Sequence, residues 1–371
     1  MKGKTLIYVS IFALLGLGVL LMAWDSRGAA AQEQAGWLPA TSLPVGMGGG
    51  LAYCPETPDS FYLVSGIEGA MITTDRLFRY DISAATWVEL ASMPKPVRLG
   101  AVSCYQGKIY VAGGWDTTTK RSLYIYDIAL GTWSTGPDLP DAVWGHGLGT
   151  WEGKLYLVGG SYGAVAELES RVDVYDIASE TWTEGGGTAM PIAAGFFARA
   201  QVGSYLYIVG GYSSAFPVNS DQTQRYDMST DTWEVGPSFT SLRALGMLAI
   251  TSSHLYMLGG DLNEGGLGDP TDLVEVLDLA AWPGGTWMDL GDPLPAINLS
   301  PATICTAILS GGEIWDVGGT NMDVGGISEV YYRLMDEPCT ANEYGVSVTP
   351  ESDEKLGATG ETIDFPLTVT N

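Results

Sequence analysis

Short hydrophobic segments that end in paired glycines recur along the chain. These segments read KIYVAGG, KLYLVGG, YLYIVGG, HLYMLGG and EIWDVGG, and they end at Gly114, Gly160, Gly211, Gly260 and Gly319. An earlier segment, FYLVSG, ends at Gly66 and is a degenerate sixth copy. Because nearly every position is apolar, we expect both faces of these strands to be buried. The paired glycines permit a positive φ where each strand leaves its sheet.

Thr-Trp pairs follow the glycine pairs at a regular distance. The tryptophans are Trp87, Trp133, Trp182, Trp233 and Trp287, spaced by 46, 49, 51 and 54 residues. In the first four copies an aspartate precedes the tryptophan by six residues, as in YDIALGTW. Its carboxylate can accept hydrogen bonds from turn amides and end a strand. The β-branched and aromatic segments between these turns predict four strands in each copy, and a period of about fifty residues indicates a repeat architecture.

Gly-Gly, Tyr and Trp at these offsets in four-stranded repeats resemble the kelch family. The resemblance covers residues 36–336, and it implies an all-β fold of radially arranged blades. The sequence departs from the family pattern at three places. Ser65-Gly66 replaces the first glycine pair, Leu277 stands where a Tyr is expected, and no Trp follows Tyr331-Tyr332.

The sixth copy therefore lacks a fourth strand, whereas a spare strand precedes the first copy. The segment WLPATSLP begins at Trp37, 50 residues before Trp87, and it matches TWVELASMP. We predict that residues 32–339 form a closed six-bladed β-propeller in which this N-terminal strand completes the last blade. Closure protects sheet edges that would otherwise invite aggregation.

The amino terminus has the features of a secretory signal. Two lysines precede an uncharged run over residues 5–24, and three alanines follow at 29–31. This order predicts a signal peptide over residues 1–31, with an uncleaved anchor as the alternative. In either case we expect the remainder to be secreted or held at the cell surface. After signal cleavage we expect no membrane insertion.

The repeat pattern stops after Cys339. The final segment, YGVSVTPESDEKLGATGETIDFPLTVTN, resembles the opening of bacterial Ig-like modules. Two or three strands cannot make an independent sandwich core. We therefore interpret residues 340–371 as a truncated Ig-like β-sandwich domain of a longer protein, with a disordered acidic tail as the alternative.

Charge and composition exclude several function classes. The 371 residues include 17 Lys and Arg against 43 Asp and Glu, a net charge of −26. The sequence has too few Lys and Arg to form a basic surface that binds phosphate groups, so we expect no nucleic-acid partner. Copper oxidases of the galactose oxidase type need two His and two Tyr on one face, but the only two histidines, His146 and His254, fall at opposite turns of their blades. Sialidase boxes of the form S-x-D-x-G-x-x-W are also absent, and we expect no cofactor.

Four cysteines are too scattered for a zinc ribbon, and export would permit disulfides. Cys54 and Cys104 fall near the ends of the first strands of neighbouring blades. Cys305 is placed similarly in the sixth blade, and Cys339 follows that blade's third strand. We favour the pairs Cys54–Cys104 and Cys305–Cys339, while the other two pairings stay open.

The kelch resemblance implies that the loops joining strands two to three and four to one share a face on which ligands bind. Aromatic faces suit sugar rings or apolar side chains, and arginine grips carboxylates. For Arg98 and Arg243 we weigh blade packing above ligand binding, and for His146 a structural role. The candidate rim residues are Arg98, Trp115, Asp116, Trp144, His146, Tyr162, Phe196, Tyr212, Arg243 and Asn298.

The loop DLNEGGLGDPTD is a weaker candidate for calcium. Its spacing of oxygen ligands and its central glycine resemble an EF-hand loop. However, strands flank it, and an ordinary solvated turn is the favoured alternative. The candidate ligands are Asp261, Asn263, Gly265, Asp269 and Asp272.

Together these features predict an exported, non-catalytic kelch propeller that binds an extracellular protein or a glycan. A carbohydrate-active enzyme similar to the sialic acid epimerases is one alternative, with Asp116, Asp141 and Asp323 as candidate acid–base groups. A purely structural spacer is another. The sequence determines neither the ligand nor the oligomeric state.

Overall fold

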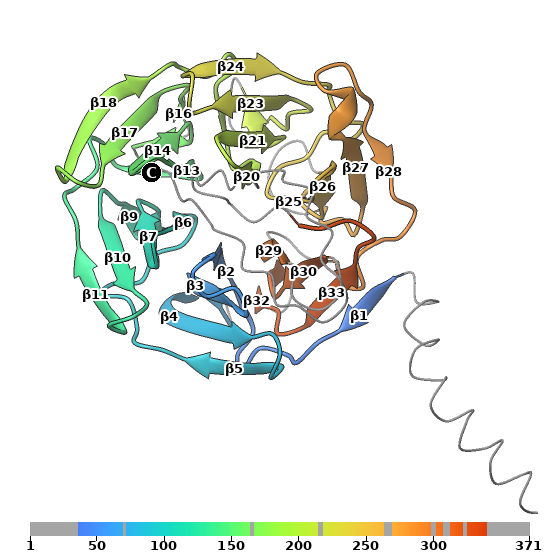
Figure 1. Cartoon of the computed structure of the whole chain (residues 1–371), viewed down its shortest axis with the longest axis horizontal. Helices are drawn as coiled ribbons and strands as arrows, with labels where there is room; N and C mark the ends of the chain where they lie inside the picture. Colours follow the sequence, from blue (N-terminus) through green and yellow to red (C-terminus); the bar gives the residue numbers. More distant parts are fainter. Residues whose placement is uncertain are drawn as a thin grey trace, which may run out of the picture. The chain divides into compact units, whose positions relative to one another are not determined.

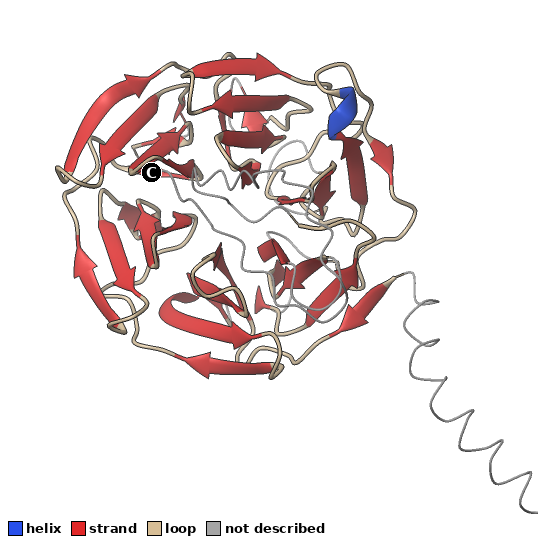
Figure 2. Ribbon diagram, viewed as in Figure 1, coloured by secondary structure: helices blue, strands red, loops and turns tan. Residues whose placement is uncertain are grey.

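A computed structural model describes residues 36–69, 72–163, 167–213, 218–262, 269–297, 302–306, 312–321 and 325–339. In these residues, six four-stranded antiparallel sheets are arranged as blades around one axis (Figures 1 and 2). The predicted six-bladed propeller is therefore confirmed. The expected signal peptide over 1–31 and the Ig-like segment over 340–371 lie outside the described residues.

Each blade runs from an inner strand at the axis to an outer strand at the circumference (Figure 1). Blades 1 and 2 consist of β2 (Met47–Tyr53), β3 (Ser60–Glu68), β4 (Ile72–Asp81) and β5 (Thr86–Glu89), and of β6 (Ala101–Tyr105), β7 (Lys108–Ala112), β10 (Leu123–Asp127) and β11 (Thr132–Thr135). Blades 3 and 4 consist of β13 (Gly147–Trp151), β14 (Lys154–Val158), β17 (Val172–Asp176) and β18 (Thr181–Gly187), and of β20 (Ala198–Val202), β21 (Tyr205–Val209), β23 (Thr223–Asp227) and β24 (Thr232–Val235).

Blade 5 consists of β25 (Met247–Ile250), β26 (His254–Leu258), β27 (Val274–Asp278) and β28 (Met288–Asp289). Blade 6 consists of β29 (Ala302–Thr306), β30 (Glu313–Val317), β33 (Val330–Leu334) and β1 (Trp37–Pro39). A 3₁₀ turn, η1 (Leu279–Ala281), lies between β27 and β28. Among the described residues, no helix has the length and apolar character needed to cross a membrane.

The N-terminal strand closes the ring as predicted. In the antiparallel pair of β1 and β33, Leu38 lies opposite Tyr332 and Pro39 opposite Tyr331. The amide of Ala40 donates to the carbonyl of Val330 over 2.8 Å and extends this pairing. Blade 6 is thus built from both ends of the propeller sequence, and β1 covers the edge of β33.

The repeated Trp joins each blade to the one before it. Trp133 lies opposite Tyr126 in its own blade, and its indole N–H donates to the carbonyl of Ala91 in the preceding connection over 2.7 Å. Trp87, Trp182 and Trp233 donate to equivalent carbonyls. In the fifth blade Trp287 is only 1% exposed, and it donates instead to the hydroxyl of Thr223.

The repeated Asp accepts a hydrogen bond within a turn, and the repeated Gly-Gly adopts positive φ, as the sequence predicts. The carboxylate of Asp127 accepts the amide of Leu130 over 2.9 Å, within the turn between strands three and four. Gly113 and Gly114 have φ of 57° and 97°. A Cβ at Gly113 would lie 2.5 Å from the carbonyl oxygen of Val143, so the turn permits no side chain there.

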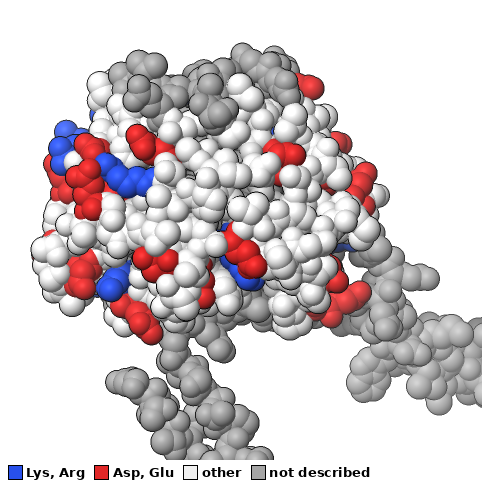
Figure 3. Space-filling view, turned by 90° about the horizontal axis from the view of Figure 1, so that it is seen from above, with Lys and Arg blue, Asp and Glu red and all other residues white. Residues whose placement is uncertain are grey.

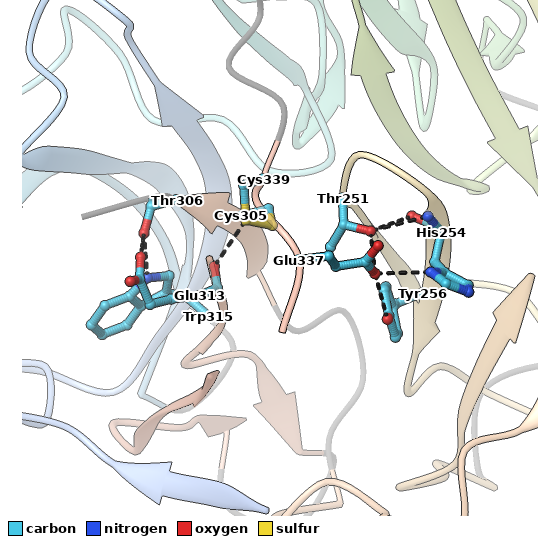
Figure 4. Close-up of a disulfide and its surroundings, with 9 residues drawn as sticks. All are labelled: Thr251, His254, Tyr256, Cys305, Thr306, Glu313, Trp315, Glu337 and Cys339. Atoms are coloured by element: carbon cyan, nitrogen blue, oxygen red, sulfur yellow. Dashed lines mark hydrogen bonds and ion pairs between the residues drawn. A yellow bond between two sulfur atoms is a disulfide. The ribbon is translucent and has the colours of Figure 1, made fainter. Parts of the chain in front are cut away.

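Two disulfides join the pairs that the sequence favoured. Cys54 and Cys104 connect the inner regions of blades 1 and 2, and Cys305 of β29 binds Cys339 beyond β33 (Figure 4). In both pairs the Cα atoms are 5.5 Å apart. The second bridge fixes the segment that leaves blade 6.

Candidate functional site

One face of the propeller is formed by short pairings between two sets of loops. The connection that enters blade 3 contains β12 (Val143–Trp144), which pairs with β15 (Ser161–Tyr162) in that blade's strand two-to-three loop. Equivalent pairings recur in blades 2, 4 and 5. The remaining short strands are β8 (Trp115–Asp116), β9 (Thr118–Thr119), β16 (Glu167–Leu168), β19 (Ala194–Gly195), β22 (Tyr212–Ser213), β31 (Thr320–Asn321) and β32 (Gly325–Gly326). The two loop sets therefore share a face.

Five of the candidate rim residues form one continuous series of contacts on this face. The guanidinium carbon of Arg98 lies 4.5 Å over the ring of Trp115, and the Trp115 and Trp144 rings are 6.3 Å apart. Trp144 meets Phe196 edge to face at 4.9 Å, and Phe196 lies 5.5 Å from Tyr212. We call these five residues the rim arc.

The rim arc has an accessible half and a buried half. Arg98, Trp115 and Trp144 are half-buried, whereas Phe196 and Tyr212 are buried. Trp144 Nε1 and Arg98 Nε have no hydrogen-bond partner among the described residues. Both of these atoms are buried, so the accessible half offers a ligand two indole faces and a cation.

Three backbone hydrogen bonds join four successive blade connections along part of the mouth of the central channel. The amide of Gly145 donates to Leu99, that of Phe196 to Gly145, and that of Leu245 to Phe196, over 2.7 to 2.9 Å. These four residues, which we call the collar, occupy the same position in successive connections between blades. All have φ between 55° and 61°. A left-handed conformation costs roughly 1–2 kcal/mol for a residue other than glycine, so the packing of the mouth holds a strained backbone.

The collar encloses a cavity of about 180 Å³ on the propeller axis. Glycines of β2, namely Gly48, Gly49 and Gly50, line the wall contributed by blade 1. A Cβ at Gly50 would lie 2.3 Å from Cγ2 of Val102, so these positions let blade 1 pack closely against its neighbours. Arg98 and Phe196 connect its lining to the rim arc.

His146 lines this cavity from blade 3 and is 5% exposed. One ring nitrogen lies within hydrogen-bonding reach of the backbone of Ala112. Burial, together with the positive charge of Arg199, lowers the pKa of His146 to about 3. The ring is therefore neutral at physiological pH, with one nitrogen left for a further hydrogen bond.

Arg199 is a channel residue that the sequence interpretation missed. It belongs to the inner strand β20, and Nη2 donates to the carbonyl of Val102 over 2.8 Å. Burial lowers its pKa to about 10, so it stays charged at neutral pH. The sequence contained a signal, because the corresponding first-strand position is aliphatic in four of the other blades. Pairing with the second strand identifies this layer as Leu51, Val102, Leu148, Arg199, Leu248 and Thr303.

Arg243 lies in the interior rather than on the rim surface. Its side chain is fully buried, and Nη2 binds the Glu275 carboxylate at 2.7 Å. Nη1 donates to the carbonyls of Leu273 and Gly259. Burial lowers the pKa of Arg243 to about 10, while Glu275 opposes that change. These contacts describe an arginine that fastens the connection between blades 4 and 5 to blade 5.

Other sequence candidates are held by local contacts. Arg171 lies over Tyr162 at 4.5 Å and binds the candidate base Asp141 at 2.9 Å. Burial raises the pKa of Tyr162. Asp116 lies 4.0 Å from the ammonium of Lys120. Asn298 and Asp323 lie outside the described residues.

The calcium candidate remains a prediction. Asp261 is buried, and its carboxylate accepts the amide of Asp269 over 3.1 Å. Asn263 and Gly265 lie outside the described residues. In the part of the chain that the structure describes, no group of three or more His, Cys, Asp or Glu side chains is placed to hold a metal ion.

On the opposite face, a polar cluster contains Ser, His and Glu side chains. Ser253 Oγ and the Glu337 carboxylate both lie 2.9 Å from the same ring nitrogen, Nδ1 of His254 (Figure 4). A nucleophilic relay needs the serine and the acid on different ring nitrogens. Glu337 also accepts the hydroxyls of Thr251 and Tyr256. The cluster therefore fastens the exit segment to blade 5.

Residues 54–260 match the KLHDC2/KLHL20/DRC7 Kelch-repeats domain family, which is more than half of the chain. This chain belongs to the kelch-repeat family. The kelch repeat protein M-T8 of Myxoma virus (strain Lausanne) is 28% identical over 149 residues, which are 39% of this chain and 26% of that protein. Kelch repeat and BTB domain-containing protein 12 of Homo sapiens is 26% identical over 160 residues, 40% of this chain and 25% of that protein.

The Kelch-like protein terF of Aspergillus terreus is 26% identical over 225 residues, 57% of this kelch chain and 38% of that protein. The kelch chain thus spans only about a quarter to two fifths of these relatives. The solved structure of YjhT superposes with a TM-score of 0.67 at 16% identity, covering 81% of this chain and 98% of that one. At this identity, the similarity shows the propeller fold alone.

Proposed function

We propose that this kelch propeller is an exported binding module that holds an extracellular protein or a glycan on its rim arc. The observation that carries the proposal is the contact series from Arg98 through Trp115 to Trp144. Aromatic residues and arginine dominate recognition surfaces because they bury large areas with little loss of conformational freedom. The guanidinium of Arg98 would bind an acidic or polar group of the ligand through charge-assisted hydrogen bonds.

Export is supported by two independent features. The sequence order at residues 1–31 is that of a secretory signal, and two disulfides join all four cysteines. Disulfides persist in oxidising compartments and are rare in the cytosol. Figure 3 shows acidic side chains in small separate groups on one side of the molecule, several beside a Lys or Arg. On that side the negative charge is dispersed over the surface.

The test compares the full chain with the double variant Arg98→Ala, Trp115→Ala. Both proteins are applied to a glycan array and used for crosslinking in medium that contains extracellular proteins. We expect a glycan or protein ligand that the double variant binds at least tenfold more weakly, since hot-spot residues each contribute about 2 kcal/mol or more.

The matched control is Leu130→Ala, Lys154→Ala, because both residues are exposed and lie away from the mouth. This variant should bind like the wild type. Equal binding by the rim variant and the wild type would favour a spacer or a different face. Turnover in a carbohydrate substrate screen would favour the enzyme alternative.

A further inference from the structure

The six equivalent first-strand residues form a narrowing of the channel, which we call the waist. Four of them are aliphatic, whereas blade 4 contributes Arg199 and blade 6 contributes Thr303. Both polar residues line the cavity below the collar and a second cavity, of about 110 Å³, toward the opposite face. A ligand in the upper cavity would therefore rest on these two side chains.

Arg199 has no carboxylate partner among the described residues. Its guanidinium reaches across blade 3 toward blade 2 and donates to the carbonyls of Leu148 and Val102. These bonds use two of its five N–H donors. Enclosing an unpaired charge is costly, and the fully buried Arg243 is paired with Glu275. In a protein with 43 acidic residues, a cation left without a carboxylate suggests an anionic ligand.

Two neutral groups in the same cavity have unused hydrogen-bonding capacity. The hydroxyl of Thr303 is buried without a hydrogen bond, and the ring of His146 keeps one nitrogen besides the one that meets the backbone of Ala112. His146 is 5% exposed and Thr303 is 8% exposed. A neutral imidazole that donates to a backbone carbonyl still accepts at its other nitrogen, and a hydroxyl both donates and accepts. They therefore match an uncharged polar group such as an alcohol, whose O–H also does both.

We propose that the channel between the collar and the waist binds a small hydroxycarboxylate, with its carboxylate on Arg199 and its hydroxyl on His146 and Thr303. A cavity of about 180 Å³ has room for one compact organic molecule. Guanidinium binds carboxylate through charge-assisted hydrogen bonds, often in pairs. This site does not require a ligand on the rim arc, so either proposal can fail alone.

The test uses calorimetric titration of the full chain with glycolate, acetate, ethylene glycol and sodium chloride at constant ionic strength. We expect glycolate to bind more tightly than acetate, because acetate lacks the hydroxyl. Ethylene glycol and chloride should give no saturable heat. The melting temperature should rise with glycolate concentration as mass action requires. No saturable carboxylate binding overturns the proposal, and equal affinity for glycolate and acetate overturns its hydroxyl part.

Two variants test which residue binds the carboxylate of the ligand and which binds its hydroxyl. Arg199→Gln should weaken glycolate and acetate alike by about tenfold or more, while Thr303→Val should weaken glycolate only. Arg76→Gln is the matched control, since Arg76 is an exposed arginine on β4, and it should change nothing. Undiminished binding by Arg199→Gln overturns the site. If that variant does not fold, Arg199→Lys replaces it, and unchanged affinity again overturns the proposal because paired bonding would be lost.

Discussion

Trp37 and Arg333 lie opposite each other in the antiparallel pair that closes the propeller. Trp37 belongs to β1, the first strand along the chain, and Arg333 belongs to β33, the third strand of blade 6. The ring therefore depends on a three-residue strand that precedes the first complete blade. Leu43, just beyond this strand, is buried between blades 6 and 1.

Deleting residues 36–44 should severely destabilise the propeller. The deletion exposes the edge of β33 and removes Leu43, which is 4% exposed. Leu43→Ala is the matched smaller change and should cost about 2–4 kcal/mol, as for other buried leucines. Thermal melts of the wild type, Leu43→Ala and the deletion variant should give melting temperatures that fall in that order. A melt unchanged by the deletion would refute closure by β1.

Breaking the pair of Arg243 and Glu275 should strongly destabilise blades 4 and 5. Glu275 also accepts the hydroxyls of Thr240 and Ser241. In Arg243→Met the carboxylate stays buried without its cation, at a cost of about 3–5 kcal/mol. The double variant Arg243→Met, Glu275→Leu should lose less than the sum of the single losses. Urea unfolding of the wild type, the two single variants and the double variant gives the four free energies of unfolding. Strictly additive losses in the double variant would contradict the pairing of Arg243 with Glu275.

Asp316 should make stability fall as pH rises toward 8. Burial raises its pKa to about 8, against about 3.9 in an unfolded chain. Between these values the native state holds a proton that the unfolded state has lost. The contribution of this group therefore decreases by about 1.4 kcal/mol per pH unit across that window.

Replacing Asp316 with Asn removes this titration. Between pH 6.5 and 9 the free energy of unfolding of Asp316→Asn should rise by about 2 kcal/mol relative to the wild type. Below pH 6.5, His146 acts in the opposite sense, because its lowered pKa leaves the native state with fewer protons than the unfolded chain. Urea unfolding at both pH values tests the prediction, with exposed Glu180→Gln as the control. Parallel pH profiles for wild type and Asp316→Asn would contradict it.

The disulfide between blades 1 and 2 should contribute substantially to stability. Cys54 and Cys104 are separated by 50 residues, and closing a loop of that length stabilises by about 4 kcal/mol in the chain-entropy account. Cys54→Ser, Cys104→Ser should lose about that much in urea unfolding. Peptide mapping of the unreduced wild type provides the control, and a Cys54–Cys305 fragment would contradict the pairing.

Repetition made the fold predictable from the sequence. Each copy presents the same Gly-Gly, Asp and Trp positions, so one set of turn and strand arguments applied to all blades. The unmatched strand at Trp37 indicated closure, and blade adjacency favoured the correct disulfides. These inferences need only local chemistry and the order of the copies.

The site was less predictable because its contacts join residues from different copies. The rim residues could be assigned to loops, but the series from Arg98 to Tyr212 depends on how neighbouring blades pack. Arg199 and Asp316 were visible only as single departures from aliphatic positions in the repeat. Arg243 was recognised as a candidate for packing, yet its partner Glu275 stands on another strand and shares no sequence signal with it.

The disulfide between Cys305 and Cys339 also determines how the propeller would respond to mechanical tension. A pull from the carboxyl side would pass through the sulfurs to the central strand β29 and bypass β33. A pull from the amino side would act on β1 at Trp37, the end where its ladder with β33 begins. The hydrogen bonds between β1 and β33 would break one after another. Under load, β1 would therefore separate from blade 6 before any other strand.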